Sequence, residues 1–156
     1  MGFALILLSS CKGDDPPQPQ LSSFEQLNYT AIEAQKGEMT ATQITVMNAS
    51  SQYVLKNGAI IVYKTKVGSF GKLLIVDNGS VNQSDKLVID MVNYNPDGSV
   101  LLSKKGVQVV VNYNFDLDAG TQTLADADQS FAFMKLGDGS KIISPELGAI
   151  FKIVSN

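Results

Sequence analysis

Four aspartates near the C-terminal end of the sequence are spaced so that they can bind a metal ion. Asp116 and Asp118 form one Asp-x-Asp pair, and Asp126 and Asp128 form another. Calcium takes about six to eight oxygen ligands, so two such pairs beside a glycine can supply several. The spacing is not that of an EF-hand, which needs Gly at the sixth position and Glu at the twelfth. Calcium is the one cofactor that the sequence suggests, but the favoured interpretation is a polar loop, because Asp bonds its own backbone in turns.

Catalysis has few side chains available to it. The chain contains no His, and its one Cys is Cys11. Without His, the most frequent general base and the usual nucleophilic triads are missing. A pair of carboxylates remains, as in glycoside hydrolysis, and so does the Ser-x-x-Lys spacing of Ser69 and Lys72, which lacks its usual partner motifs. We therefore expect a protein without enzymatic activity and keep a carboxylate-based hydrolase as an alternative.

Two aromatic residues lie where they can contact a ligand. Phe70 belongs to a Gly-Ser-Phe-Gly segment that is typical of a hairpin tip, and Tyr94 precedes an Asn-Pro-Asp-Gly turn. We expect both rings to be exposed and able to stack on a sugar. The chain has no Trp, and Tyr53, Tyr63 and Tyr113 lie in or beside expected strands, where they pack. The unknown partner is therefore a protein or a glycan.

The charge of the chain argues against nucleic acid as a partner. The formal net charge is −3, and all 12 basic residues are Lys. A nucleic-acid-binding domain normally carries a basic patch and reads phosphate or guanine through Arg. No Lys-rich run compensates for the missing Arg.

Short apolar runs separated by Gly, Asn and Asp must position these residues. They predict strands at residues 44–47, 59–67, 72–77, 86–94, 99–103, 107–115, 130–136, 141–144 and 149–154. Residues 107–115 show the clearest alternation of apolar and polar positions. Residues 104–106, Lys-Lys-Gly, are interpreted as a turn, and residues 24–35 predict the one helix. The fold class is therefore all-β, an antiparallel sandwich or partly open barrel of about eight strands with one short N-terminal helix.

The N-terminus has the features of an export signal. Residues 3–8 are apolar but far fewer than the roughly 20 needed to span a bilayer, as is typical of the core of a signal peptide. Leu8-Ser9-Ser10-Cys11 resembles the lipobox of bacterial lipoproteins, which implies cleavage before Cys11 and acylation of that residue. Met1-Gly2 departs from the pattern, because a signal peptide opens with Lys or Arg, so we expect the n-region to be incomplete.

The residues after the cysteine carry a second resemblance. Lys12, Asp14 and Asp15 are similar to the export signal of Bacteroidota surface lipoproteins, which implies a lipid-anchored protein of the outer membrane, on the cell surface. The chain also resembles small β-rich Bacteroidota lipoproteins of unassigned function. The matching segments are Gly71-Lys72-Leu73, Tyr94-Asn95-Pro96-Asp97-Gly98 and Asp116-Leu117-Asp118.

The chain is thus expected to have three parts. Residues 1–10 are a signal peptide, residues 11–23 hold the lipidated Cys and a flexible tether rich in Pro, and residues 24–156 form one β-rich domain. Cys11 attaches this domain to the membrane. We expect a non-enzymatic binding or structural accessory module, with a carbohydrate-binding accessory lipoprotein as the first alternative.

Overall fold

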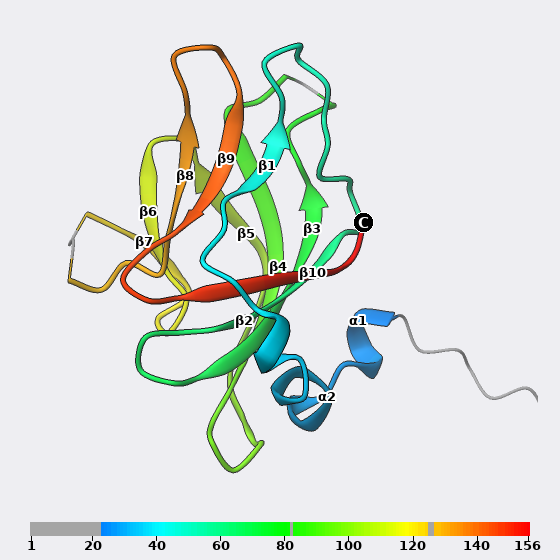
Figure 1. Cartoon of the computed structure of the whole chain (residues 1–156), viewed down its shortest axis with the longest axis vertical. Coiled ribbons are helices and arrows are strands. Elements are labelled where there is room, and N and C mark those ends of the chain that lie inside the picture. The colour runs from blue at the N-terminus through cyan, green and yellow to red at the C-terminus, as the bar shows by residue number, and fades with distance from the viewer. Residues whose placement is uncertain (1–22, 82, 125–126) are drawn as a thin grey trace, which may run out of the picture.

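The computed structural model describes residues 23–81, 83–124 and 127–156 (Figure 1). These residues form two antiparallel sheets of five strands each, which do not close into a barrel. The all-β prediction is confirmed in its sandwich form. No helix in these three ranges is both long and apolar enough to cross a membrane. The expected signal peptide and almost all of the expected tether lie outside the described residues.

Each sheet combines segments that are distant in the sequence. Sheet A has the order β10-β2-β3-β4-β5, with bounds Ile150–Ser155, Ile60–Lys64, Phe70–Asp77, Lys86–Tyr94 and Val100–Val110. Sheet B has the order β1-β9-β8-β6-β7, with bounds Ile44–Met47, Lys141–Pro145, Phe131–Lys135, Tyr113–Asp116 and Thr121–Thr123. Strands β2 to β5 are neighbours in chain order and form a meander, and the last strand, β10, returns to sheet A beside β2.

The main core lies between the two sheets. In β4, alternate side chains point inward, so Leu87, Ile89 and Met91 are fully buried. Sheet B contributes Phe131, whose ring stacks on that of Phe115 with centroids 5.1 Å apart. Aromatic and branched side chains fill this layer at interior density, which holds the two sheets in register with each other.

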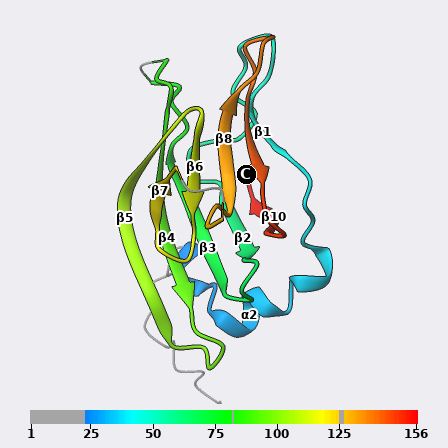
Figure 2. The ribbon, with the colours of Figure 1, turned by 90° about the vertical axis from the view of Figure 1, so that its left-hand side faces the viewer.

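A second, smaller core covers the outer face of sheet A. It is formed by the clasp, the segment 23–39 that contains α1 (Ser23–Gln26), α2 (Tyr29–Glu33) and η1 (Lys36–Glu38). Ile32 of α2 is fully buried against this face. Figures 1 and 2 show the two helices at one end of the sandwich, away from the hairpin tip of β8 and β9.

The clasp corrects the expectation of one helix over residues 24–35. Two short helices replace it, because the chain changes direction at Leu27 and Asn28. The Asn28 backbone is extended, and its side chain accepts a hydrogen bond from the backbone N–H of Ala31, which begins α2. Asn is a strong N-cap residue, and here it starts a second helix within the range predicted for one.

The predicted strand 107–115 is also wrong as a single strand. β5 ends at Val110, Asn112 adopts a left-handed backbone with φ 65°, and β6 begins at Tyr113 in the other sheet. Asn tolerates this conformation better than most residues. The alternation misleads because Val109 and Phe115 face the same interior from opposite sheets, so the pattern continues through the crossover.

The predicted turn at residues 104–106 is a bulge inside β5. Met91 pairs with Lys104 and Ile89 with Val107, so two residues of β5 lie opposite Asp90 alone. Gly106 has φ 64°, and its N–H donates to the Asp90 carboxylate at 2.7 Å. A β-bulge accommodates the extra residue without ending the strand.

Gly71 and Tyr63 form a cross-strand pair between β3 and β2. A Cβ atom at Gly71 would lie 2.2 Å from Cζ of Tyr63 and 2.6 Å from the carbonyl oxygen of Val92. The fully buried Tyr63 ring therefore occupies the space over Gly71. Aromatic rings cover strand glycines in this way in other sheets.

Candidate functional site

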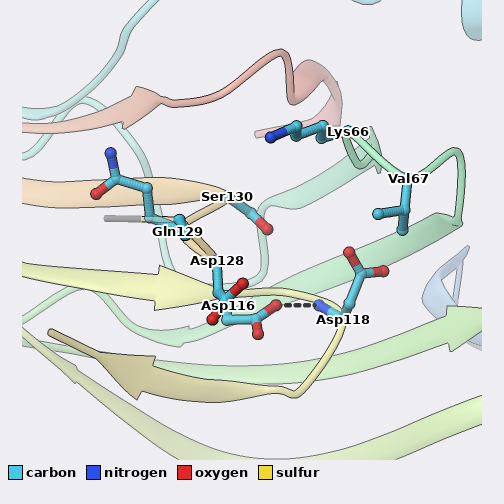
Figure 3. Close-up of a pocket in the computed structure, with 8 residues that line it drawn as sticks. Lys66, Val67, Asp116, Asp118, Asp128, Gln129 and Ser130 are labelled. Atoms are coloured by element: carbon cyan, nitrogen blue, oxygen red, sulfur yellow. Dashed lines mark hydrogen bonds between the residues drawn. The ribbon is translucent and has the colours of Figure 1, made fainter. Parts of the chain in front are cut away.

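The aspartate cluster lines a cleft of about 340 Å³ at one edge of the sandwich (Figure 3). The cleft is built by the β2–β3 turn, the chain after β6 and the chain before β8. The lining side chains that Figure 3 labels are Lys66, Val67, Asp116, Asp118, Asp128, Gln129 and Ser130. Three of the four predicted aspartates thus share one cleft, and Asp126 lies outside the described residues.

Two of these carboxylates already accept hydrogen bonds from the protein. Asp116 Oδ1 accepts the backbone N–H groups of Asp118 at 2.8 Å and Ala119 at 3.2 Å; Figure 3 marks the first bond with a dashed line. Asp118 Oδ1 accepts from the Thr65 hydroxyl and the Asn93 amide, each at 3.2 Å. The bonds of Asp118 connect the chain after β6 to the β2–β3 turn and to β4.

This geometry does not add support to a calcium site. Among the residues that the structure describes, no three carboxylate, His or Cys side chains converge as metal ligands. The bonds of Asp116 and Asp118 are those expected of a polar loop that organises its own backbone. Calcium binding by Asp116, Asp118, Asp126 and Asp128 stays a prediction from the sequence.

The expectation that Phe70 and Tyr94 are exposed is wrong. They are 5% and 7% exposed, because Tyr29 of α2 packs edge-on against both rings, with centroids 5.8 and 6.3 Å apart. Phe70 is also not at a hairpin tip; it is the first residue of β3, and the turn occupies residues 66–68. The Tyr94 hydroxyl donates to the Leu27 carbonyl at 3.3 Å, which ties the ring to the clasp.

A larger cleft, the sheet A groove, lies beside the clasp and has a volume of about 420 Å³. Its floor is the outer face of β3 and β4, its walls are α1 and β5, and Tyr94 reaches its edge. The side chains lining it are Phe24, Glu25, Lys72, Leu74, Asp90, Met91, Val92, Tyr94, Val100, Ser103, Lys104 and Lys105. The floor combines the apolar side chains of Leu74 and Val92 with the charged side chains of Lys72 and Asp90, and binding clefts usually combine an apolar lining with a few polar groups.

Lys72 fixes the wall of this groove. The residue is 4% exposed, and its ammonium donates to the backbone carbonyls of Phe24 at 2.5 Å and Leu27 at 2.7 Å. The ammonium also lies 4.5 Å from the centroid of the Phe24 ring, within cation–π distance. Burial lowers the pKa of the Lys72 ammonium, while the charge of Glu25 opposes that shift. Lys72 therefore joins the clasp to sheet A, and among the described residues no hydrogen bond between Lys72 and Ser69 is recorded.

A third cleft of about 300 Å³ contains a buried lysine that the sequence pattern did not single out. Lys141 is 3% exposed, lies 2.9 Å from Asp85 Oδ1, and donates to the Ser84 carbonyl at 2.8 Å. The hydrogen bond from Lys141 is the main cause of the lowered pKa of Asp85, and Lys135 at 3.7 Å adds to it. The pair ties the β3–β4 loop to sheet B. Alternation placed Lys141 at the start of a strand but gave no sign that the loop covers it.

Comparison with known proteins supplies no family for this chain. No protein-family model, curated protein or solved structure matches it. Cys11, Lys12, Asp14 and Asp15 lie outside the described residues, so their predicted roles are carried by the sequence alone.

Proposed function

We propose that this chain is a lipid-anchored protein of the cell envelope whose sandwich acts as a non-enzymatic binding module. Acylated Cys11 would hold it in the outer membrane, on the cell surface. The observation that carries the binding role is the sheet A groove, a cleft of about 420 Å³ that is lined by both apolar and charged side chains and walled by the clasp. The lack of His, and the expected acylation of the one Cys, favour binding over catalysis.

The position of the clasp is consistent with an anchor at Cys11. The described domain begins at Ser23, and its first helices are held to sheet A by Lys72, Tyr94 and Ile32. A pull on the residues before Ser23 would therefore act on a segment that is packed and hydrogen-bonded. Two or three acyl chains bind a membrane stably, whereas one chain is marginal.

Glycan binding is less well supported than protein binding. A sugar-binding face needs two or three exposed aromatic rings, and Phe70 and Tyr94 are buried. Among the described residues, Tyr113 is the one aromatic residue with more than about a third of its surface exposed, at 42%. A carboxylate hydrolase has no additional support, because Asp116 and Asp118 in the aspartate cleft both serve as acceptors for the protein itself.

Mass spectrometry and fractionation test the anchor. The protein would be produced from its natural gene in a Bacteroidota host, as wild type, as Cys11→Ser, and as Ser22→Ala for a matched change in the tether. Wild type and Ser22→Ala should carry acyl chains on Cys11 and fractionate with the outer membrane, whereas Cys11→Ser should leave the membrane. A free thiol at Cys11 in wild type, or membrane association of Cys11→Ser equal to wild type, would overturn the proposal.

Replacing Asp14 and Asp15 by Ala tests surface exposure separately. The double variant should stay acylated but become protected from protease added to intact cells, because the resemblance implies that these residues direct export. Equal digestion of the variant and the wild type would refute the predicted role of Asp14 and Asp15 while leaving the anchor in place.

A further inference from the structure

The third cleft lies at the end of the sandwich opposite the clasp. It has a volume of about 300 Å³ and is lined by the β1–β2 loop, the β3–β4 loop and the adjoining ends of β8 and β9. Figures 1 and 2 show these connections at one end of the molecule and the clasp at the other. Loops that a rigid scaffold holds at one end are frequent positions for binding residues. This cleft is therefore a second candidate site, separate from the sheet A groove.

Hydrogen bonds fix the walls of the third cleft. The Tyr53 hydroxyl donates to the Gly79 carbonyl at 2.9 Å, which joins the β1–β2 loop to the β3–β4 loop. Lys141, at the start of β9, donates to the Ser84 carbonyl at 2.8 Å and lies 2.9 Å from Asp85 Oδ1, which joins sheet B to the β3–β4 loop. A site whose walls are fixed before binding loses less conformational freedom when a ligand enters. The third cleft is thus preorganised.

The third cleft has an excess of positive charge. The ammonium groups of Lys135 and Lys141 lie 3.7 and 2.9 Å from the same oxygen, Oδ1 of Asp85, and no other charged side chain of the described residues lines the cleft. Two ammonium groups beside one carboxylate leave one positive charge in excess, in a chain whose net charge is −3. A singly charged anion would neutralise the cleft, whereas a doubly charged anion would make it negative.

Hydrogen-bond donors also outnumber acceptors in the third cleft. An ammonium group has three donors; Lys141 directs its own to Asp85 and Ser84, and Lys135 has no side-chain hydrogen bond recorded among the described residues. Within the same ranges, no hydrogen bond is recorded for the side chains of Ser51, Ser80 and Gln83, which line the cleft. A carboxylate accepts hydrogen bonds and donates none. The lining is therefore complementary to a carboxylate in hydrogen bonding as well as in charge.

Two lining residues have an unusual backbone conformation. Ser51 has φ 61° and Gln83 has φ 49°, in the left-handed region that glycine adopts at lower cost. Both positions nevertheless carry polar side chains, and both side chains belong to the third cleft. Residues in such conformations cluster at ligand-binding sites. The backbone thus gives a second indication of a site, independent of the charge.

We propose that the third cleft binds the carboxylate group of a small hydroxylated acid. The carboxylate contacts the ammonium groups of Lys135 and Lys141, and the ligand hydroxyls pair with Ser51, Ser80 and Gln83. A volume of about 300 Å³ is at the lower end of the range for ligand sites, which fits a small molecule. The inference goes beyond the proposed function, which rests on the lipid anchor and the sheet A groove.

Titration of the ¹⁵N-labelled full chain at constant ionic strength tests the inference. The probe is sodium gluconate, and its matched control is sorbitol, which has the same hydroxylated carbon chain with CH₂OH in place of the carboxylate. Gluconate should shift the amides of Ser51, Gln83, Asp85, Lys135 and Lys141, and those shifts give its Kd. Sorbitol should bind at least about tenfold more weakly. Inorganic phosphate at pH 8, a doubly charged oxyanion, should bind no more tightly than gluconate.

Two neutralised lysines locate the site. The Lys135 side chain is 45% exposed, so Lys135→Gln should fold normally and weaken gluconate binding at least about threefold. Lys36→Gln changes an exposed lysine of the clasp with the same effect on net charge, and should alter the Kd less than about 1.5-fold.

Several results would overturn the inference. They are equal binding of gluconate and sorbitol, tighter binding of phosphate, equal effects of Lys135→Gln and Lys36→Gln, shifts confined to residues outside the third cleft, and no shift at about 50 mM gluconate. The acylation measured at Cys11 would be unaffected by such a failure, so the two proposals fail separately.

Discussion

Replacing Gly71 by Ala should destabilise the sandwich, because the new methyl group has no space. The added Cβ would lie 2.2 Å from a carbon and 2.3 Å from the hydroxyl oxygen of the Tyr63 side chain, and 2.6 Å from the Val92 carbonyl oxygen. Carbon atoms in ordinary contact are about 3.5–4.0 Å apart. The Tyr63 ring is fully buried between the sheets, so it cannot turn away, and the Val92 oxygen belongs to the neighbouring strand.

The expected cost follows from these contacts. Overpacking a core costs about 1–3 kcal/mol, and the upper end applies where backbone and a buried ring must both shift. Alanine restricts the unfolded chain and returns about 0.4–1 kcal/mol. The free energy of unfolding should therefore fall by about 2 kcal/mol, and the midpoint of thermal unfolding by about 6–10 °C for a domain of this size.

Urea unfolding followed by circular dichroism measures this change. Gly137→Ala is the matched control, because a Cβ atom at Gly137 would have nothing within 4 Å of it and the residue has no positive φ. That variant should change stability by less than about 1 kcal/mol. A double variant with Tyr63→Leu should reduce the cost of Gly71→Ala by about 1 kcal/mol, since one of the two obstacles is gone. Equal stability of Gly71→Ala and Gly137→Ala would refute the argument for the Tyr63 pair.

Three further predictions concern the clasp and the turns. Ile32→Ala should lower the free energy of unfolding by about 2–4 kcal/mol, because the side chain is fully buried between the clasp and sheet A. A loss below about 0.5 kcal/mol in urea would contradict this packing. Lys72→Met should leave two clasp carbonyls without their donor, cost about 1–3 kcal/mol, and speed hydrogen exchange in the clasp before the rest of the domain. Ser99 and Ser140 each donate to the Asp two residues earlier, Asp97 and Asp138, and so lower the pKa of both carboxyl groups below the ordinary value of 3.8. The stabilisation by these two carboxylates is therefore present above about pH 4 and lost as the pH falls through their folded-state pKa. The double variant Asp97→Asn/Asp138→Asn should lose less free energy of unfolding between about pH 6 and pH 3 than wild type. An equal loss would contradict the assignment.

The strand pattern was largely predictable because it is local. β4 (Lys86–Tyr94) matches the predicted range, and β1, β8, β9 and β10 lie at the predicted places. Their alternation reports which side of a sheet each side chain faces. The same local pattern failed at Asn112, since a chain that crosses between sheets can keep its apolar side chains facing one interior.

The candidate sites were less predictable, because they depend on what covers a face. Asp116, Asp118 and Asp128, which the sequence grouped as possible calcium ligands, line one cleft, but their hydrogen bonds are those of a polar loop and calcium binding stays a prediction. No sequence pattern indicated that Tyr29 would cover Phe70, or that Lys72 would be buried beneath the first helix.

The sequence by itself determined the all-β class, several of the turns and the face that most strand residues occupy, because these depend on side-chain type and a period of two residues. The tertiary structure alone decided which faces are covered and which lysines are buried. Those properties arise from contacts between segments far apart in the chain, such as residues 27 and 94, and no local period records them.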